Sequence, residues 1–148
     1  MADKAASERR ANDPSIGYSG RTMGQKLGVK EGAAIALRHA PADWEIPHLP
    51  PRVEINADLD EAFDIAIWFV RNAAELAGEI ADVASRVPAG SSLWIAWPRR
   101  AGGHVSDVTE QSIRDHVLPT GLVDVKVAAL DTDWSALKFM WRRAKARP

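Results

Sequence analysis

A short apolar run at residues 93–97 constrains the fold of this chain more than any other feature. It follows two serines and ends abruptly in Pro98, Arg99 and Arg100. An apolar run without alternating polar residues fits a strand buried on both faces of a parallel sheet better than a strand with one face in water. The run therefore predicts a central strand with a charged carboxyl end.

Two earlier runs, at residues 33–37 and 64–70, predict further buried strands by the same argument. Residues 53–55 predict a short edge strand. Asn72, with Glu75 three residues later, resembles a capping box and predicts the start of a helix. Apolar residues at helical spacing continue that helix until a Pro-Ala-Gly turn stops it.

The later part of the chain predicts a second helix and a closing hairpin. Thr109 is the predicted cap of the helix, and Gly121 follows it. Residues 123–130 and 134–141 predict two strands joined by a connection too short for a crossover, so they pair antiparallel. Near the start, Gly28 closes a short predicted helix. Alternating strands and helices make the fold class a three-layer α/β sandwich with a mostly parallel sheet.

Length and composition fit one α/β domain at residues 15–143, with a polar tail at 1–14 and a basic tail at 144–148. The net charge of -1 gives no general attraction to nucleic acid or to anionic membranes. The chain has no cysteine, which excludes disulfides and thiolate chemistry. No apolar run reaches the roughly 20 residues that a spanning helix needs. We expect a cytoplasmic protein that does not enter membranes.

Basic residues gather where the three predicted parallel strands end. The residues at these ends are Arg38 and His39, Arg71 and Asn72, and Trp97, Pro98, Arg99 and Arg100. Ligands of open α/β sheets bind at the carboxyl ends of the strands, and helix N-termini such as those at Asn72 and Thr109 attract anions. The sequence therefore predicts a phosphate or carboxylate site at this edge. The alternative is that the arginines are solvated or pair with Asp107, Asp131 and Asp133.

Aromatic residues give further candidates for the same edge. Tyr18 and Ser19 precede the domain and could fold over the site as a lid, or form only a packing turn. Trp97 and Trp134 could stack on a planar ligand, with core packing as the alternative.

The histidines provide no metal site and only one candidate for catalysis. They are His39, His48, His104 and His116, and they lack metal-binding spacing. His39 alone stands at a predicted strand end, where it could act as an acid or base. We assign no catalytic residue and no metal ligand.

The order of these elements resembles the Rossmann-like fold of S-adenosylmethionine-dependent methyltransferases. Residues 30–32 form the turn before the first strand, and residues 88–91 resemble the LxPGG turn of that fold. In those enzymes a glycine-rich loop after the first strand holds S-adenosylmethionine. Here residues 38–44 contain no glycine, and residues 37–64 are too few for the usual two strands and two helices. The resemblance implies a shortened cofactor half and argues against S-adenosylmethionine as a cofactor.

More specifically, the chain resembles a bacterial family catalogued as domain of unknown function 3052. The matching stretches, from residue 17 to about residue 143, are residues 17–20, 27–30, 96–100, 107–110, 121–126 and 134–138. The family implies a fold but no established activity.

We therefore expect a non-enzymatic, methyltransferase-like domain that binds an anionic small molecule or a partner protein. A divergent methyltransferase or other transferase is the first alternative, and a homodimeric interaction module is the second. Nucleic acid is disfavoured as a partner by the near-neutral charge.

Overall fold

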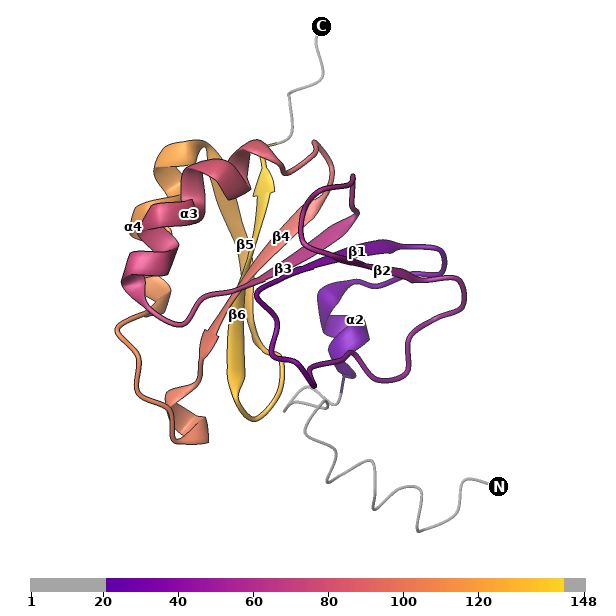
Figure 1. Ribbon diagram of the computed structural model, residues 1–148, viewed down its shortest axis with the longest axis horizontal. Coiled ribbons are helices and arrows are strands. Elements are labelled where there is room, and N and C mark those ends of the chain that lie inside the picture. Colours follow the sequence, from indigo (N-terminus) through magenta and orange to yellow (C-terminus); the bar gives the residue numbers. More distant parts are fainter. Residues whose placement is uncertain (1–20, 143–148) are drawn as a thin grey trace, which may run out of the picture.

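The computed structural model describes residues 21–142. In chain order the elements are α2 (Met23–Leu27), β1 (Ala34–Arg38), β2 (Glu54–Ala57), β3 (Ile65–Phe69), α3 (Ala73–Ser85), β4 (Ser92–Pro98), the 3₁₀ helix η1 (Arg100–Gly102), α4 (Glu110–Val117), the 3₁₀ helix η2 (Leu118–Thr120), β5 (Leu122–Ala129) and β6 (Trp134–Trp141) (Figure 1). The predicted tails, together with Tyr18 and Ser19, lie outside the described residues.

The six strands form one sheet in the order β2-β1-β3-β4-β6-β5. Strands β2, β1, β3 and β4 are parallel to one another, and β6 pairs antiparallel with both β4 and β5. This confirms the mostly parallel α/β sheet with an antiparallel hairpin at its end. The predicted edge strand at 53–55 is present as β2, which begins one residue later and ends two residues later.

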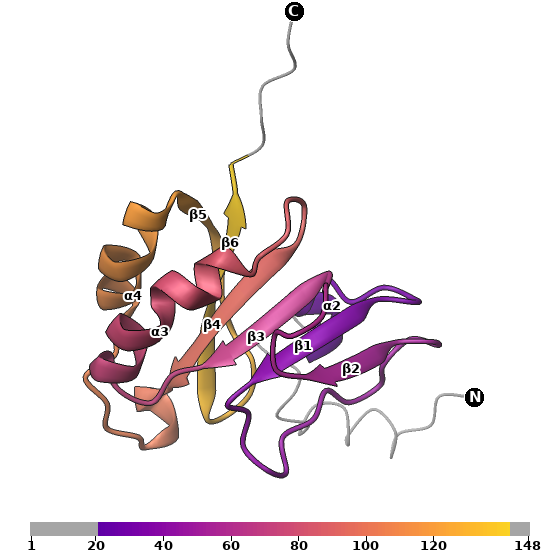
Figure 2. The same cartoon turned by 45° about the horizontal axis from the view of Figure 1, so that its top comes forward.

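Helices α3 and α4 lie together on one face of the sheet, while α2 lies on the other (Figures 1 and 2). The second face is also covered by the irregular segment between β1 and β2, from which Ile46 is buried and Trp44 partly buried. No helix occurs between β1 and β2, so this layer is made of one short helix and a loop.

Local sequence signals set the helix ends. Asn72 accepts a hydrogen bond from the Glu75 N–H (2.9 Å), which begins α3. The Glu75 carboxylate accepts from the Arg71 N–H (3.3 Å), one residue before the cap, so the expected capping box is shifted. Thr109 and Ser112 form a complete capping box on α4. Gly28 ends α2 with a φ of 80°, which favours glycine.

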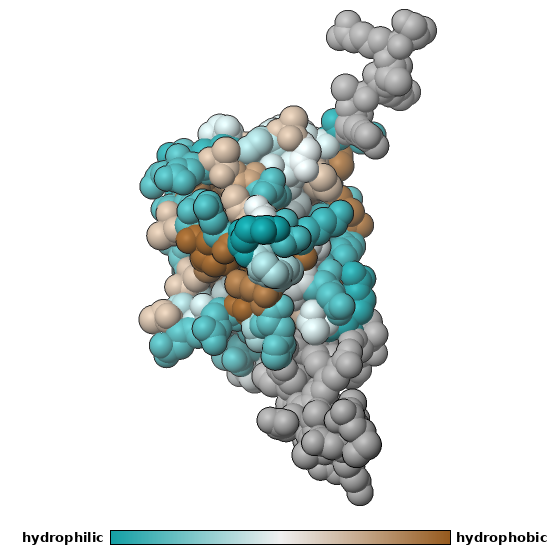
Figure 3. Space-filling model, turned by 90° about the vertical axis from the view of Figure 1, so that its right-hand side faces the viewer, coloured by the Kyte–Doolittle hydropathy of each residue, from teal (hydrophilic) through white to brown (hydrophobic). Residues whose placement is uncertain are grey.

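Strand β2 forms one edge of the sheet, on the right in Figure 1, and is mostly exposed. Ile55 is 45% exposed there. Seen from that side, the molecule shows an apolar area bordered by hydrophilic residues (Figure 3).

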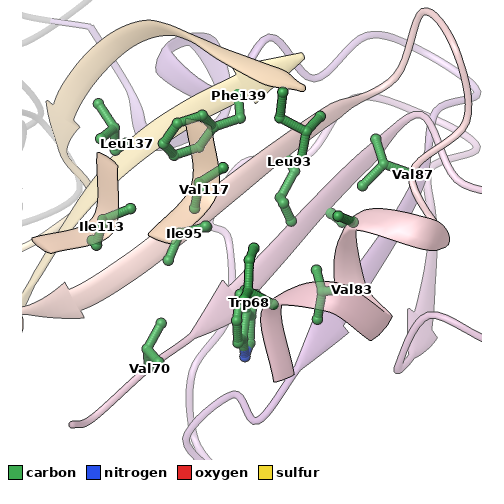
Figure 4. Close-up of a cluster of buried hydrophobic side chains, with 14 of the residues drawn as sticks. Trp68, Val70, Val83, Val87, Leu93, Ile95, Ile113, Val117, Leu137 and Phe139 are labelled. Carbon is green, nitrogen blue, oxygen red and sulfur yellow. The ribbon is translucent and has the colours of Figure 1, made fainter. Parts of the chain in front are cut away.

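The sheet separates two hydrophobic cores. The helix-side core lies beneath α3 and α4, where Trp68, Leu93 and Ile95 of the sheet meet Val83 and Ile113 of the helices (Figure 4). The loop-side core lies beneath α2 and the 39–53 segment. β3 contributes buried residues to both cores, as a strand without polar alternation requires.

Candidate functional site

The carboxyl ends of β1, β3 and β4 meet at one edge of the sheet because these strands are parallel neighbours. All the predicted site residues from Arg38 onward are near strand or helix ends at this edge. Apart from Asn72, which caps α3, their side chains fall into three groups with different partners.

Arg38 and His39 are compensated by carboxylates. Arg38, whose side chain is 13% exposed, donates from Nε to Glu79 (2.8 Å) and pairs with Asp58 (3.2 Å) and Asp82 (3.6 Å). His39 Nε2 lies 2.9 Å from Glu79. These partners differ from the aspartates considered in the sequence, and they leave Arg38 engaged rather than open to an anion.

Glu79 is the centre of this group. Burial would by itself raise the pKa of its carboxyl, but hydrogen bonds from His39 and Arg38 outweigh burial and lower the pKa below its ordinary value. Glu79 is therefore held as a carboxylate that joins α3 to the end of β1.

His39, Glu75 and Glu79 also offer ligand atoms that all lie within 4.8 Å of one another. Sequence spacing did not reveal this group, because residue 39 is far along the chain from α3. The only local signal was the four-residue interval between the two glutamates, which places them on one helix face. Glu79 is already bonded to Arg38, so we read the group as an ion-pair network.

Arg71 and Trp134 form the second group. The Arg71 guanidinium lies 5.7 Å from the centre of the Trp134 ring. That ring packs edge-on against Phe69, with ring centres 4.9 Å apart, and Trp44 also packs edge-on against Phe69, with ring centres 4.8 Å apart. Trp134 belongs to the loop-side core and Trp97 to the helix-side core. The two tryptophans considered together in the sequence therefore face opposite sides of the sheet.

The third group forms a pocket of about 420 Å³ at the end of β4, referred to below as the strand-end pocket. Its lining residues are Trp97, Pro98, Arg99, Arg100, Ala101, Ser106, Val108, Thr109, Glu110 and Ser135. Five of the predicted residues thus come together here: Trp97, Pro98, Arg99, Arg100 and Thr109. Arg38, His39, Arg71, Asn72 and Trp134 do not line it.

Hydrogen bonds join the pocket wall to the β5–β6 turn. The Arg99 N–H donates to the Asp133 carbonyl (2.8 Å), and its guanidinium donates to the Asp131 carbonyl (3.1 Å). His104 lies 2.8 Å from the Asp133 carboxylate. The alternative considered from the sequence was that the arginines pair with aspartates such as Asp131 and Asp133. Arg99 does bond to these two residues, but to their backbone carbonyls.

Arg100 differs from its neighbour. Its side chain is exposed, and its guanidinium makes no hydrogen bond or ion pair with any residue in the described range 21–142. Glu110, the one carboxylate in the lining, is paired with Arg114 at 2.7 Å. The pocket therefore presents an uncompensated positive charge beside the start of α4.

Two polar residues that the sequence did not single out also shape this edge. Ser106 donates to the Arg71 carbonyl (2.9 Å) and accepts from the Val108 N–H, which holds the loop before α4. Lys26 of α2 is buried and donates to the Ala129 carbonyl (2.7 Å). Burial, and then the charge of Arg99, lower the pKa of Lys26. Both contacts join distant segments, so local patterns gave no signal for them.

A family described as "Protein of unknown function (DUF3052)" matches residues 50–143. The chain belongs to the DUF3052 family. The resembling stretches before residue 50 lie outside this match. No curated protein matches this DUF3052 chain.

Solved structures with a similar fold include several methyltransferases and fibrillarins. A fibrillarin from Aeropyrum pernix, solved with natively bound S-adenosyl-L-methionine, has a TM-score of 0.54 at 15% identity, covering 80% of this chain and 73% of its own. A fibrillarin from Methanococcus jannaschii has a TM-score of 0.55 at 13% identity, and the match covers 87% of this chain and 76% of the fibrillarin. An O-methyltransferase family 2 protein from Planctomyces limnophilus has a TM-score of 0.50 at 16% identity. The match covers 86% of this chain and 48% of that protein. These similarities show a Rossmann-like, methyltransferase-like fold.

Within the described residues, no helix has the length and apolar character needed to cross a membrane.

Proposed function

We propose that this DUF3052 domain is a non-catalytic, methyltransferase-like module that binds a phosphate or carboxylate group in the strand-end pocket. The observation that carries the proposal is the exposed guanidinium of Arg100, which no carboxylate of residues 21–142 compensates. The anion belongs to a small molecule or, in the broader form of the proposal, to a partner protein.

The surroundings of Arg100 support this assignment. The hydrogen bonds of Arg99 to the β5–β6 turn hold the backbone that carries Arg100, so little ordering of the backbone is required on binding. The first N–H groups of α4 lie at the same pocket, and helix N-termini favour anions. Trp97 offers part of an apolar wall for the rest of the ligand.

A thermal-shift panel of inorganic phosphate, nucleotides, sugar phosphates and acyl-CoAs tests the proposal. We expect at least one anion to raise the melting temperature by several degrees, because ligand at about 100 times Kd adds roughly 2.7 kcal/mol of stability. Arg100→Gln should abolish the rise caused by any anion that occupies the strand-end pocket. Arg86→Gln is the control, since it removes one exposed positive charge at the opposite end of α3, and its partners Asp60 and Asp82 line neither pocket. The small-molecule form of the proposal is contradicted if no anion raises the melting temperature of the wild type. It is also contradicted if the two variants lose the ligand-induced rise to the same extent.

A divergent methyltransferase or other transferase is the second candidate. The observation that favours it is the similarity in fold to a protein that holds S-adenosyl-L-methionine. Against it, the segment after β1 has no glycine, and Arg38 there is bonded to Asp58 and Glu79. Calorimetry with S-adenosylmethionine at millimolar concentration separates the transferase from the non-catalytic module, since heat of binding would favour the transferase.

Self-association remains a third candidate, through the exposed edge strand β2 with Ile55. Light scattering over a concentration series tests it, and a monomer at every concentration would count against it.

We place the module in the cytoplasm, a reducing compartment suited to a chain without cysteine.

A further inference from the structure

A second pocket of about 420 Å³ lies at the opposite edge of the sheet, where β1, β3 and β4 begin. We call it the strand-start groove. Ala33, Ile65 and Ser92 at the strand starts, the end of α2 and the outer part of β6 line it. It shares no residue with the strand-end pocket.

The charged residues of this groove are unequally compensated. Asp64 accepts a hydrogen bond from the Ala34 N–H (2.8 Å), and Glu31 pairs with Arg52. In contrast, the ammonium groups of Lys30 and Lys138 make no hydrogen bond or ion pair with any residue from 21 to 142. Glu31 is therefore neutralised by an arginine and Asp64 is hydrogen-bonded to a backbone amide, while neither lysine has an acidic partner among these residues.

A third lysine increases this positive charge on the adjoining sheet face. Lys138 and Lys126 lie 5.9 and 5.6 Å from the centre of the Trp94 ring, so both ammonium groups stand over one buried indole. Burial, then the charge of Lys138, lower the pKa of Lys126. Like charges held this close repel each other, and an anion between them would relieve the repulsion.

We propose that the strand-start groove binds a small ligand carrying two linked phosphate groups, held by Lys30 and Lys138 with Lys126 at its flank. Several separated ammonium groups match a ligand with more than one negative charge, because each lysine acts as a point charge. The groove has the volume of a small-molecule site. Met140 and Leu27 supply apolar contact beside the charges. This site is additional to the one proposed at Arg100.

Isothermal titration with inorganic pyrophosphate at low salt tests the site. We expect Lys138→Gln and Lys30→Gln each to weaken binding about tenfold, which corresponds to about 1.4 kcal/mol. Arg86→Gln, at the residue that follows α3, is the charge-matched control, because it removes one cation from the other face of the sheet, and it should leave the affinity unchanged. Far-ultraviolet circular dichroism of each variant checks that the fold is retained.

Arg100→Gln separates this proposal from the proposed function. If the groove binds pyrophosphate, Arg100→Gln retains the binding that Lys138→Gln loses. Carbon-13 spectra of the lysine side chains give an independent readout, in which the pyrophosphate should raise the pKa of Lys126. The proposal is overturned if the lysine variants bind as the wild type does, if Arg86→Gln weakens binding equally, or if only Arg100→Gln matters. Binding of a polyglutamate peptide but not of pyrophosphate would also overturn it, in favour of a protein-docking surface.

Discussion

Gly102 lies so close to Thr132 that a Cβ on the glycine would stand 2.3 Å from the Thr132 carbonyl oxygen. The glycine belongs to η1 on the wall of the strand-end pocket, and the threonine to the β5–β6 turn. Because the obstructing atom is backbone, a larger residue can be accepted only if the two segments move apart. The contact thus fixes the loop that carries Arg100.

Gly102→Ala should therefore destabilise the protein by about 1–3 kcal/mol, the usual range for overpacking. It should also weaken anion binding at Arg100. Gly78→Ala is the matched control, since a Cβ at that position in α3 meets nothing within 4 Å. That change should stabilise the helix by about 0.5–1 kcal/mol. Chemical denaturation of both variants measures the difference, and equal stability in the two would contradict the close contact.

Arg99 and Arg100 should respond differently to substitution although they are adjacent. Arg99→Ala removes the donor to the Asp131 carbonyl, so it should lower stability by about 1 kcal/mol. Arg100→Ala should leave the melting temperature of the free protein unchanged, because no residue of the described range makes a hydrogen bond or ion pair with its guanidinium. Scanning calorimetry without ligand decides this. If Arg100→Ala lowered stability more than Arg99→Ala does, the assignment of Arg99 to structure and of Arg100 to anion binding would be refuted.

The Glu79 network should make stability depend on acid pH. The pKa of Glu79 is lower in the folded protein than the ordinary 4.5, so its contribution is complete above that value and is lost as pH falls through the folded pKa. Glu79→Gln should flatten the decline in stability below about pH 4.5 and reduce stability at neutral pH. Urea denaturation at a series of pH values measures both effects. Parallel pH curves for the wild type and the variant would show that Glu79 keeps its ordinary pKa.

Asn72 should contribute to stability as a helix cap. Asn72→Ala removes the acceptor for the Glu75 N–H and should cost about 1 kcal/mol, while Asn72→Asp should cost little. Thermal unfolding of the two variants tests this. The assignment fails if alanine and aspartate at this position are equally stable.

The backbone plan of this domain could be derived from sequence because its signals are local. The runs at 33–37, 64–70 and 93–97 carry the pattern of strands buried on both faces, and all three are parallel neighbours. Asn72 and Thr109 cap the helices where predicted, because a cap depends on atoms three residues away. Strand direction then brings the basic residues to one edge.

The partners of those basic residues depended on tertiary structure. Arg38 reaches Glu79 across 41 positions, and Arg99 reaches the Asp131 carbonyl across 32. Such contacts depend on which face each strand turns toward its neighbours, and no short-range pattern encodes that. The sequence by itself determined a methyltransferase-like sheet with Pro98, Arg99 and Arg100 at the end of its central strand. Only the folded chain decided that Arg38 is neutralised and Arg99 anchored while Arg100 stays open, because the energy of a charge depends on its neighbours in space.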